Sequence, residues 1–159
     1  MIIDGKKEAQ LFRDEIKKEI ESIKSKNNKV PSLSVILIGD YAPSQIYVKN
    51  KEKNAKEVGI NSKVIKYSKD VSEQEVLNKI KELNDNDAVS GILVQLPLPP
   101  QINKEKIINT INPLKDVDGF HPINVGNLSS GYNATVPCTP LGCLLLIKKV
   151  DPNLSGKHA

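Results

Sequence analysis

The fold of this chain is decided by Leu33-Ser-Val-Ile-Leu-Ile38 and by the stretch directly after it, Gly39-Asp-Tyr-Ala-Pro-Ser-Gln-Ile-Tyr-Val-Lys-Asn-Lys-Glu-Lys-Asn-Ala-Lys-Glu-Val-Gly59. The first segment is short and apolar, which is typical of a buried strand. Pro43 suits the first turn of a helix, and Gly59 suits the residue just past its end. The sequence therefore predicts a strand, a turn at Gly39 and a helix.

The predicted helix carries one lysine in an unexpected place. At about 100° per residue, one stripe of the helix holds Ser44, Tyr47, Lys51, Ala55 and Val58. The other lysines of the helix fall on the opposite face, which is expected to meet solvent: Lys49, Lys53 and Lys56. Two explanations of Lys51 are open. Its stem can cover apolar surface while the ammonium reaches water, or a partly desolvated ammonium can exchange protons with a substrate.

The composition is that of an ordinary folded domain. The chain has 159 residues, of which 26% are charged and 38% apolar, enough for one domain with a hydrophobic core. A net charge of +4 and the lack of tryptophan make a nucleic-acid partner unexpected. No apolar run approaches the roughly 20 residues that cross a bilayer, so we expect no membrane partner and a cytoplasmic location. Cys138 and Cys143 match no common metal spacing, which predicts two reduced thiols and no metal site.

Strands and helices are predicted to alternate along the chain. A helix over about residues 7–26 precedes the first strand, and a second strand covers about residues 62–67. The first helix is predicted to have one apolar face: Ala9, Phe12, Ile16, Ile20 and Ile23. Ser72 and Glu75 form a capping box for a helix whose inner face is expected to hold Val76, Ile80 and Leu83. A third strand is predicted over residues 88–96, and Asn103 is predicted to cap a short helix through residue 111. This alternation predicts an α/β fold: a three-layer α-β-α domain with a mostly parallel sheet.

The sequence loses its periodicity after residue 112. Residues 113–133 are rich in turn formers and are predicted to be a long loop, functional or disordered, in which His121 makes a hydrogen bond. Residues 136–142 are then predicted to begin a helix that carries Leu144, Leu145 and Ile147.

Polar candidates follow two of the predicted strands. Ligands of parallel sheets bind beyond the carboxyl ends of the strands, so we expect Lys51 and Gln95 to meet at one edge. Each candidate also has a simpler explanation: Tyr47 as a core aromatic, Gln95 bonded to loop backbone, and Asp118 as the turn residue of an Asp-Gly pair. A lysine in such a place can also form a Schiff base with a carbonyl substrate.

Four ordered motifs resemble a known family. They are Tyr47-Val-Lys-Asn-Lys51, Gly91-Ile-Leu-Val-Gln-Leu-Pro-Leu-Pro99, Lys115-Asp-Val-Asp-Gly-Phe-His-Pro122 with Asn124 and Gly126, and Pro137-Cys-Thr-Pro140 with Gly142. Together they cover nearly all of the chain. The chain resembles the bifunctional methylenetetrahydrofolate dehydrogenase/methenyltetrahydrofolate cyclohydrolases of one-carbon metabolism.

The resemblance implies a role for each candidate residue. Lys51 would be the catalytic lysine, Gln95 would hold it by a hydrogen bond, and Tyr47 would stack on the aminobenzoyl ring of the folate. Asp118 would bind the pterin. The backbone of Val94, Gln95 and Leu96 would line the folate slot. The implied activities are oxidation of methylenetetrahydrofolate with NADP and hydrolysis of methenyltetrahydrofolate to formyltetrahydrofolate.

The resemblance also implies a division of the chain. Residues 1–150 would form the folate-binding catalytic domain, and residues 151–159 a linker to an NADP-binding Rossmann domain. No G-x-G-x-x-G spacing occurs in the sequence, so no cofactor-binding residue is expected here. We therefore expect the chain alone not to oxidise methylenetetrahydrofolate. The family is homodimeric through a contact that would lie mainly in the second domain. A non-catalytic fragment that binds folate weakly is the alternative.

Overall fold

The computed structural model describes residues 2–27 and 29–158. Helices and strands alternate from the first strand to the fourth helix, as the sequence predicts. In chain order the elements are α1 (Gly5–Asn27), β1 (Ser32–Ile38), α2 (Ala42–Glu57), β2 (Asn61–Tyr67), α3 (Glu73–Asp85), β3 (Gly91–Val94), α4 (Lys104–Thr110), α5 (Pro122–Ser129) and α6 (Cys138–Val150).

The three strands form one parallel sheet in the order β2-β1-β3. At its centre, Val35 of β1 pairs with Val64 of β2 and with Leu93 of β3. The third strand is shorter than the predicted span of residues 88–96. Asn86 explains its late start, because the backbone N–H groups of Ala88 and Val89 both donate to Asn86 and form a turn instead of a ladder.

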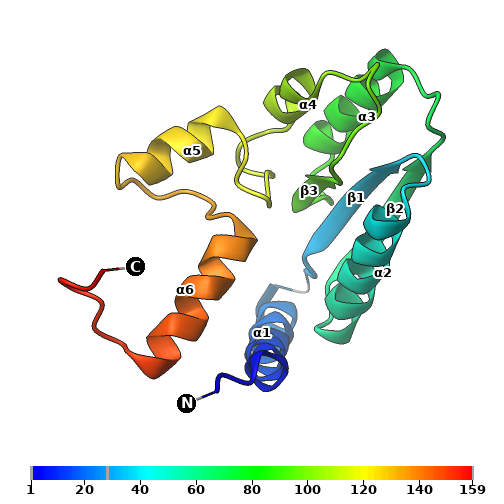
Figure 1. Cartoon of the computed structure of the whole chain (residues 1–159). Helices are drawn as coiled ribbons and strands as arrows, with labels where there is room; N and C mark the ends of the chain where they lie inside the picture. The colour runs from blue at the N-terminus through cyan, green and yellow to red at the C-terminus, as the bar shows by residue number, and fades with distance from the viewer. Residues whose placement is uncertain (1, 28, 159) are drawn as a thin grey trace.

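Helices cover both faces of the sheet, with α3 and α4 on one side and α2 on the other (Figure 1). Alternation along β1 sends Ile36 and Ile38 into the first core and Val35 and Leu37 into the second. The largest fully buried side chains belong mainly to the first core: Ile36, Ile80, Ile92 and Ile107. Each such side chain stabilises the fold by about 1.5–3 kcal/mol. The predicted three-layer α-β-α architecture is confirmed.

The predicted caps of α3 and α4 are also confirmed. The Ser72 side chain accepts a hydrogen bond from the Glu75 backbone at 3.2 Å, and the Asn103 side chain accepts one from the Lys106 backbone at 3.0 Å. The predicted inner face of α3 is buried as expected: Val76, Ile80 and Leu83.

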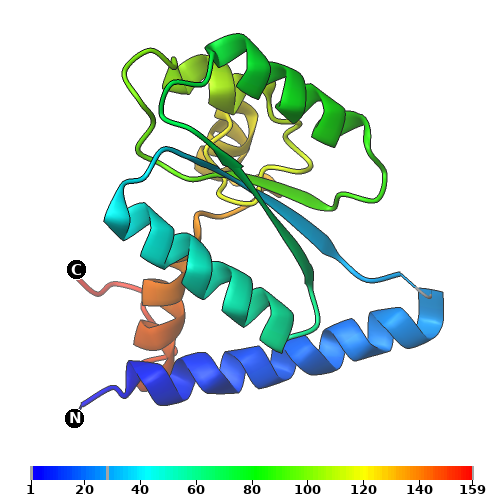
Figure 2. The same cartoon turned by 90° about the vertical axis from the view of Figure 1, so that its right-hand side faces the viewer.

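Helix α1 runs past the carboxyl end of α2 and is largely exposed (Figure 2). Only Ile20 of its predicted apolar face is buried, whereas Ile16 and Ile23 are exposed. Arg13 reaches Glu57 of α2 at 3.4 Å, and Glu8 lies 3.4 Å from Lys149 of α6. The helix is therefore attached to the domain by a few contacts along its length.

The prediction of a structureless loop over residues 113–133 was wrong for residues 122–129, which form α5. Pro122 stands in the first turn of the helix, where proline is favoured, and His121 caps the helix by accepting a hydrogen bond from the Ile123 backbone at 3.2 Å. The stretch is too short to show a helical period.

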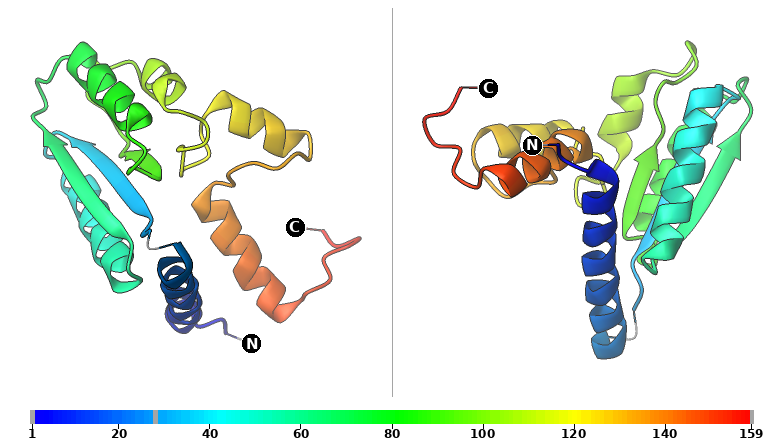
Figure 3. Two further views of the ribbon diagram at one scale, coloured as in Figure 1. Left: turned by 180° about the vertical axis from the view of Figure 1, so that it is seen from behind. Right: turned by 60° about the horizontal axis from the view of Figure 1, so that its bottom comes forward.

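Helices α5 and α6 lie beyond β3, away from the two layers that cover the sheet (Figure 3). Among the described residues, no helix is long and apolar enough to cross a membrane.

Candidate active site

The predicted contact between the lysine and the glutamine is present in the structure. Lys51 is half-buried on α2, and its Nζ donates a hydrogen bond to Oε1 of Gln95 at 3.2 Å. Gln95 directly follows β3, and its backbone N–H donates to the Ile36 carbonyl at 2.9 Å. Its Nε2 donates to the Leu96 carbonyl at 2.7 Å. Because both ends of the amide are engaged, Oε1 is fixed toward the lysine.

Ser44 also belongs to this contact, although the sequence predicted no role for it beyond the helix stripe. It lies two turns before Lys51, is only 3% exposed, and donates from Oγ to the Leu96 carbonyl at 3.3 Å. The Leu96 carbonyl thus accepts from both Ser44 and Gln95, which ties α2 to the end of β3. Because a buried hydroxyl needs a hydrogen-bond partner, the place of Ser44 on a stripe predicted to be buried could have indicated this role.

The loop that carries Asp118 lies against the start of β3. Ile92 pairs with Asp116 in an isolated parallel bridge, and the Ile92 N–H donates to the Lys115 carbonyl at 2.7 Å. A Cβ at Gly91 would lie 2.4 Å from Cγ1 of Val117, so this close approach requires glycine. The loop is therefore a fourth, irregular element beside the sheet edge.

Asp118 is half-buried on this loop. Burial raises the pKa of its carboxyl, and the negative charge of Asp116 raises it further, whereas the positive charge of Lys51 lowers it. A carboxylate with few competing water contacts is a strong acceptor for a ligand that brings its own N–H donors.

A cleft of about 640 Å³ joins Lys51 and Asp118. Its floor is the sheet face around Leu33 and Leu93, and its walls come from α2, from the Asp118 loop with Phe120, and from residues 137–140 at the start of α6. The cleft reaches Ser32 and Gly91, the first residues of β1 and β3. The prediction that the site lies at the carboxyl ends of the strands is thus only partly right: the Lys51–Gln95 contact is there, but the cleft runs back over the sheet.

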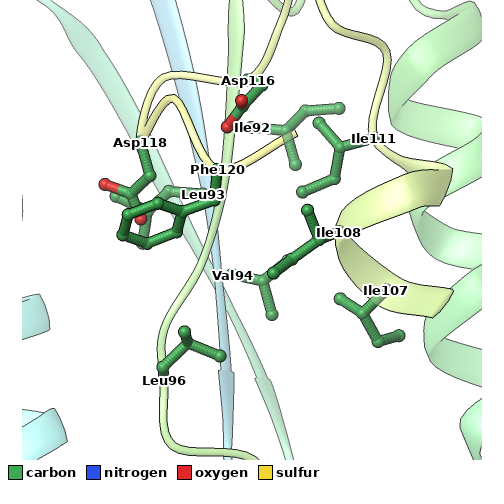
Figure 4. Close-up of a pocket in the computed structure, with 10 residues that line it drawn as sticks. All are labelled: Ile92, Leu93, Val94, Leu96, Ile107, Ile108, Ile111, Asp116, Asp118 and Phe120. Atoms are coloured by element: carbon green, nitrogen blue, oxygen red, sulfur yellow. The ribbon is translucent and has the colours of Figure 1, made fainter. Parts of the chain in front are cut away.

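A narrow apolar gap of about 10 Å³, roughly the room of one water molecule, lies on the other side of Asp118. Val94 and Leu96 help to line it, together with isoleucines of β3 and α4. Figure 4 shows the side chain of Asp118 beside the ring of Phe120, with Val94 and Leu96 further along the strand. Asp118 and Phe120 line both the gap and the cleft.

Tyr47 is 63% exposed, one turn before Lys51 on α2. The interpretation of Tyr47 as a core aromatic is therefore wrong. Val48, the residue after Tyr47, is buried instead, although the predicted stripe left it out. The stripe residues Ser44, Ala55 and Val58 are buried as predicted. The lysines predicted to face solvent are exposed: Lys49, Lys53 and Lys56.

Comparison with known proteins identifies the family of this chain. Residues 3–118 match the family described as "Tetrahydrofolate dehydrogenase/cyclohydrolase, catalytic domain". The chain belongs to this family. The matched segment contains Tyr47, Lys51, Gln95 and Asp118.

Individual members of the tetrahydrofolate dehydrogenase/cyclohydrolase family are similar over the whole chain. The "Bifunctional protein FolD" of Pelagibacter ubique is 62% identical over 159 residues, which are 100% of this chain and 57% of that protein. The FolD structure from Campylobacter jejuni has a TM-score of 0.95 at 45% identity and covers 99% of this chain and 56% of its own. The Trypanosoma brucei enzyme, solved with NADP cofactor and an inhibitor, has a TM-score of 0.94 at 32% identity, covering 99% and 54%. The chain thus spans about half the length of the relatives it matches.

Proposed function

We propose that residues 1–150 form the folate-binding catalytic domain of a bifunctional methylenetetrahydrofolate dehydrogenase/cyclohydrolase, with residues 151–159 as a linker. The observation that carries the proposal is the fixed Lys51–Gln95 contact at 3.2 Å, on a cleft that Lys51 shares with Asp118. The cleft has a volume of about 640 Å³, which suits a ligand of folate size, since pockets for small molecules measure roughly 300–1,000 Å³.

Lys51 is proposed to move the proton in the hydrolysis of methenyltetrahydrofolate. Water adds to the methenyl carbon, one of the two carbon–nitrogen bonds of that carbon breaks, and a formyl group stays on the other nitrogen. The water oxygen loses two protons as it becomes the formyl carbonyl. One must reach the nitrogen that leaves, and an amine at the cleft wall can carry it; the other is released to solvent, because the positive charge of the methenyl group is lost. Gln95 supports this role because it holds the amine in one place without neutralising it, which a carboxylate partner would do.

The remaining residues are proposed to bind and orient the folate. Asp118 would accept hydrogen bonds from the amino group and ring nitrogen of the pterin, with the ring of Phe120 beside it. Val94, Gln95 and Leu96 would line the slot. The ring of Tyr47 would stack on the aminobenzoyl group, which its exposed position one turn before Lys51 supports.

For the whole protein we propose NADP-dependent oxidation of methylenetetrahydrofolate as a second activity. The names of the relatives support it, since they describe bifunctional enzymes, and the Trypanosoma brucei structure contains NADP. The residues of this chain do not fit that cofactor: the sequence has no G-x-G-x-x-G motif, and within residues 2–27 and 29–158 Gly91 is the only glycine that lines the cleft. No residue of this chain is therefore proposed to hold NADP. Homodimerisation and a cytoplasmic location are proposed as well; the exposed free thiols of Cys138 and Cys143 suit a reducing compartment.

The test is the hydrolysis of methenyltetrahydrofolate, followed by its absorbance with and without the purified chain. We expect acceleration over buffer that scales with protein concentration, and heat release on titration with tetrahydrofolate. Binding without acceleration would overturn the catalytic proposal and leave a folate-binding fragment. Neither binding nor acceleration would overturn both.

A further inference from the structure

A buried carboxylate next to the site has no part in the chemistry proposed above. Asp116 is 4% exposed. Its Oδ1 accepts a hydrogen bond from the Gly119 N–H at 3.1 Å, and its Oδ2 accepts from the His121 N–H and from Nδ2 of Asn124, both at 2.9 Å. All three donors are uncharged, and all lie within the next eight residues of the chain. The carboxylate therefore serves the shape of its own loop.

Asp116 links two anchored ends of that loop. Its backbone pairs with Ile92 at the start of β3, which holds the first end against the sheet. Its carboxylate holds His121 and Asn124, which belong to the start of α5, and Asn124 also donates to the Pro113 carbonyl at 2.9 Å. The turn from residue 117 to residue 120 is thus closed at both ends through one side chain.

The two residues that this turn presents are Asp118 and Phe120, on either side of Gly119. Both line the cleft, and Figure 4 shows their side chains next to each other. Gly119 has a φ of +68°, and a Cβ there would lie 2.6 Å from the Thr135 carbonyl oxygen, so the turn is also pressed against the segment that leads to α6. Little room remains for a different path of the chain.

We propose that Asp116 is a positioning residue, whose buried carboxylate fixes the turn over residues 116–121 and so holds Asp118 and Phe120 at the cleft wall. It does not touch the substrate itself. The proposal rests on the proposed function for the identity of the ligand. It goes beyond that function in assigning the orientation of the pterin-binding carboxylate to a second, buried aspartate.

An amide cannot replace this carboxylate. Asparagine has one acceptor oxygen, and its NH2 group only donates. With asparagine at position 116, either the Gly119 N–H or the pair from His121 and Asn124 would face a donor. A buried N–H would lose its partner in either rotamer, which favours a different path of the turn.

The test compares Asp116→Asn with Asp87→Asn, an exposed aspartate in the turn after α3. In the free chain, the carboxyl of Asp118 is titrated by carbon NMR. We expect its titration in Asp116→Asn to move toward that of an ordinary aspartate, because a neighbouring charge is lost and the turn opens to water. The KM for methenyltetrahydrofolate should rise about tenfold or more, the usual effect of a lost hydrogen bond to a charged group, with a smaller change in kcat. Asp87→Asn should change neither quantity.

Two further variants separate positioning from a purely structural role. Asn124→Ala removes one of the three donors and should move both readouts in the same direction by less. In an Asp118→Asn background, Asp116→Asn should raise KM by less than about twofold, because neighbours that act through each other are not additive. An unchanged Asp118 titration together with an unchanged KM, in a folded Asp116→Asn protein, would overturn the proposal. Asn124→Ala keeps the charge of Asp116, so its Asp118 titration reports the position of the turn and needs no folate. An Asp118 titration equal to that of the unmodified chain, in a folded Asn124→Ala protein, would also overturn the proposal, even where the hydrolysis test fails.

Discussion

Replacing Gln95 by leucine tests whether the Lys51 ammonium must be held in place. Leucine has a similar volume but offers no acceptor to Nζ of Lys51, which lies 3.2 Å from Oε1 of Gln95. It also removes the donor to the Leu96 carbonyl, which still accepts from Ser44. The backbone N–H of residue 95 keeps its bond to Ile36, so the strand end should stay in place. The lysine is then the group that moves.

The size of the effect follows from that one bond. A hydrogen bond from a charged donor contributes about 1.5–3 kcal/mol, and each 1.36 kcal/mol corresponds to a factor of ten. If the bond holds Lys51 in its reactive position, kcat/KM for hydrolysis of methenyltetrahydrofolate should fall by roughly 10- to 100-fold. The free energy of unfolding should change by less than about 1.5 kcal/mol, since Gln95 is half-buried and leucine suits the apolar side of its surroundings.

The assay is the initial rate of absorbance change at several substrate concentrations, with urea unfolding as the check on folding. Gln45→Leu is the matched control, because Gln45 is exposed on the same helix as Lys51. Its kcat/KM should match that of the unmodified chain. Wild-type kcat/KM in a folded Gln95→Leu protein would show that the glutamine does not hold the lysine for catalysis.

Other residues give predictions of different kinds. The pKa of the Asp118 carboxyl is raised by burial, so the folded chain binds more protons than the unfolded chain as pH rises from the ordinary aspartate value through the raised one, and the free energy of unfolding falls over that interval. Asp118→Asn should abolish this fall in urea titrations at a series of pH values while weakening folate binding at neutral pH; an unchanged pH profile would contradict the assignment. Ile80→Ala, at a side chain with 0% exposure in the α3 core, should lower the free energy of unfolding by about 2–5 kcal/mol, measured by urea, without changing KM for the folded fraction. Gly119→Ala should destabilise the chain more than Gly131→Ala, because both have positive φ but only Gly119 would press a Cβ against backbone, 2.6 Å from the Thr135 oxygen; equal losses would show that the close contact relaxes freely.

Much of the layered fold follows from local signals. Ser72 and Asn103 are residue types that favour the N-cap of a helix, so they mark where α3 and α4 begin. The spacing of Val76, Ile80 and Leu83 fits one helical face. The alternation of these elements then predicts the parallel sheet. The signal failed where pairing or packing decides the outcome: the turn at Asn86 shortens β3, and no local pattern shows that α1 leaves Ile16 and Ile23 exposed.

The site was predicted in part for the same reason. The position of Lys51 on an otherwise apolar stripe and the polar end of β3 are local features, and their contact follows from the topology of the sheet. The outward position of Tyr47 depends on a helix rotation of less than one residue, which a stripe of about 100° per residue does not resolve. The Asp116 carboxylate accepts hydrogen bonds from two backbone N–H groups and from the side chain of Asn124, eight residues later. The sequence shows only an Asp-Val-Asp-Gly turn there.

We propose that Lys51, and not the general positive charge of α2, carries the hydrolysis. The most direct measurement compares Lys51→Ala with Lys53→Ala, since both remove one lysine from the same helix but only Lys51 lines the cleft. We expect Lys51→Ala to reduce the rate of methenyltetrahydrofolate hydrolysis by about 100-fold or more, the usual contribution of a proton-transfer group, and Lys53→Ala to leave it unchanged. Equal rates for the two folded variants would contradict the proposal.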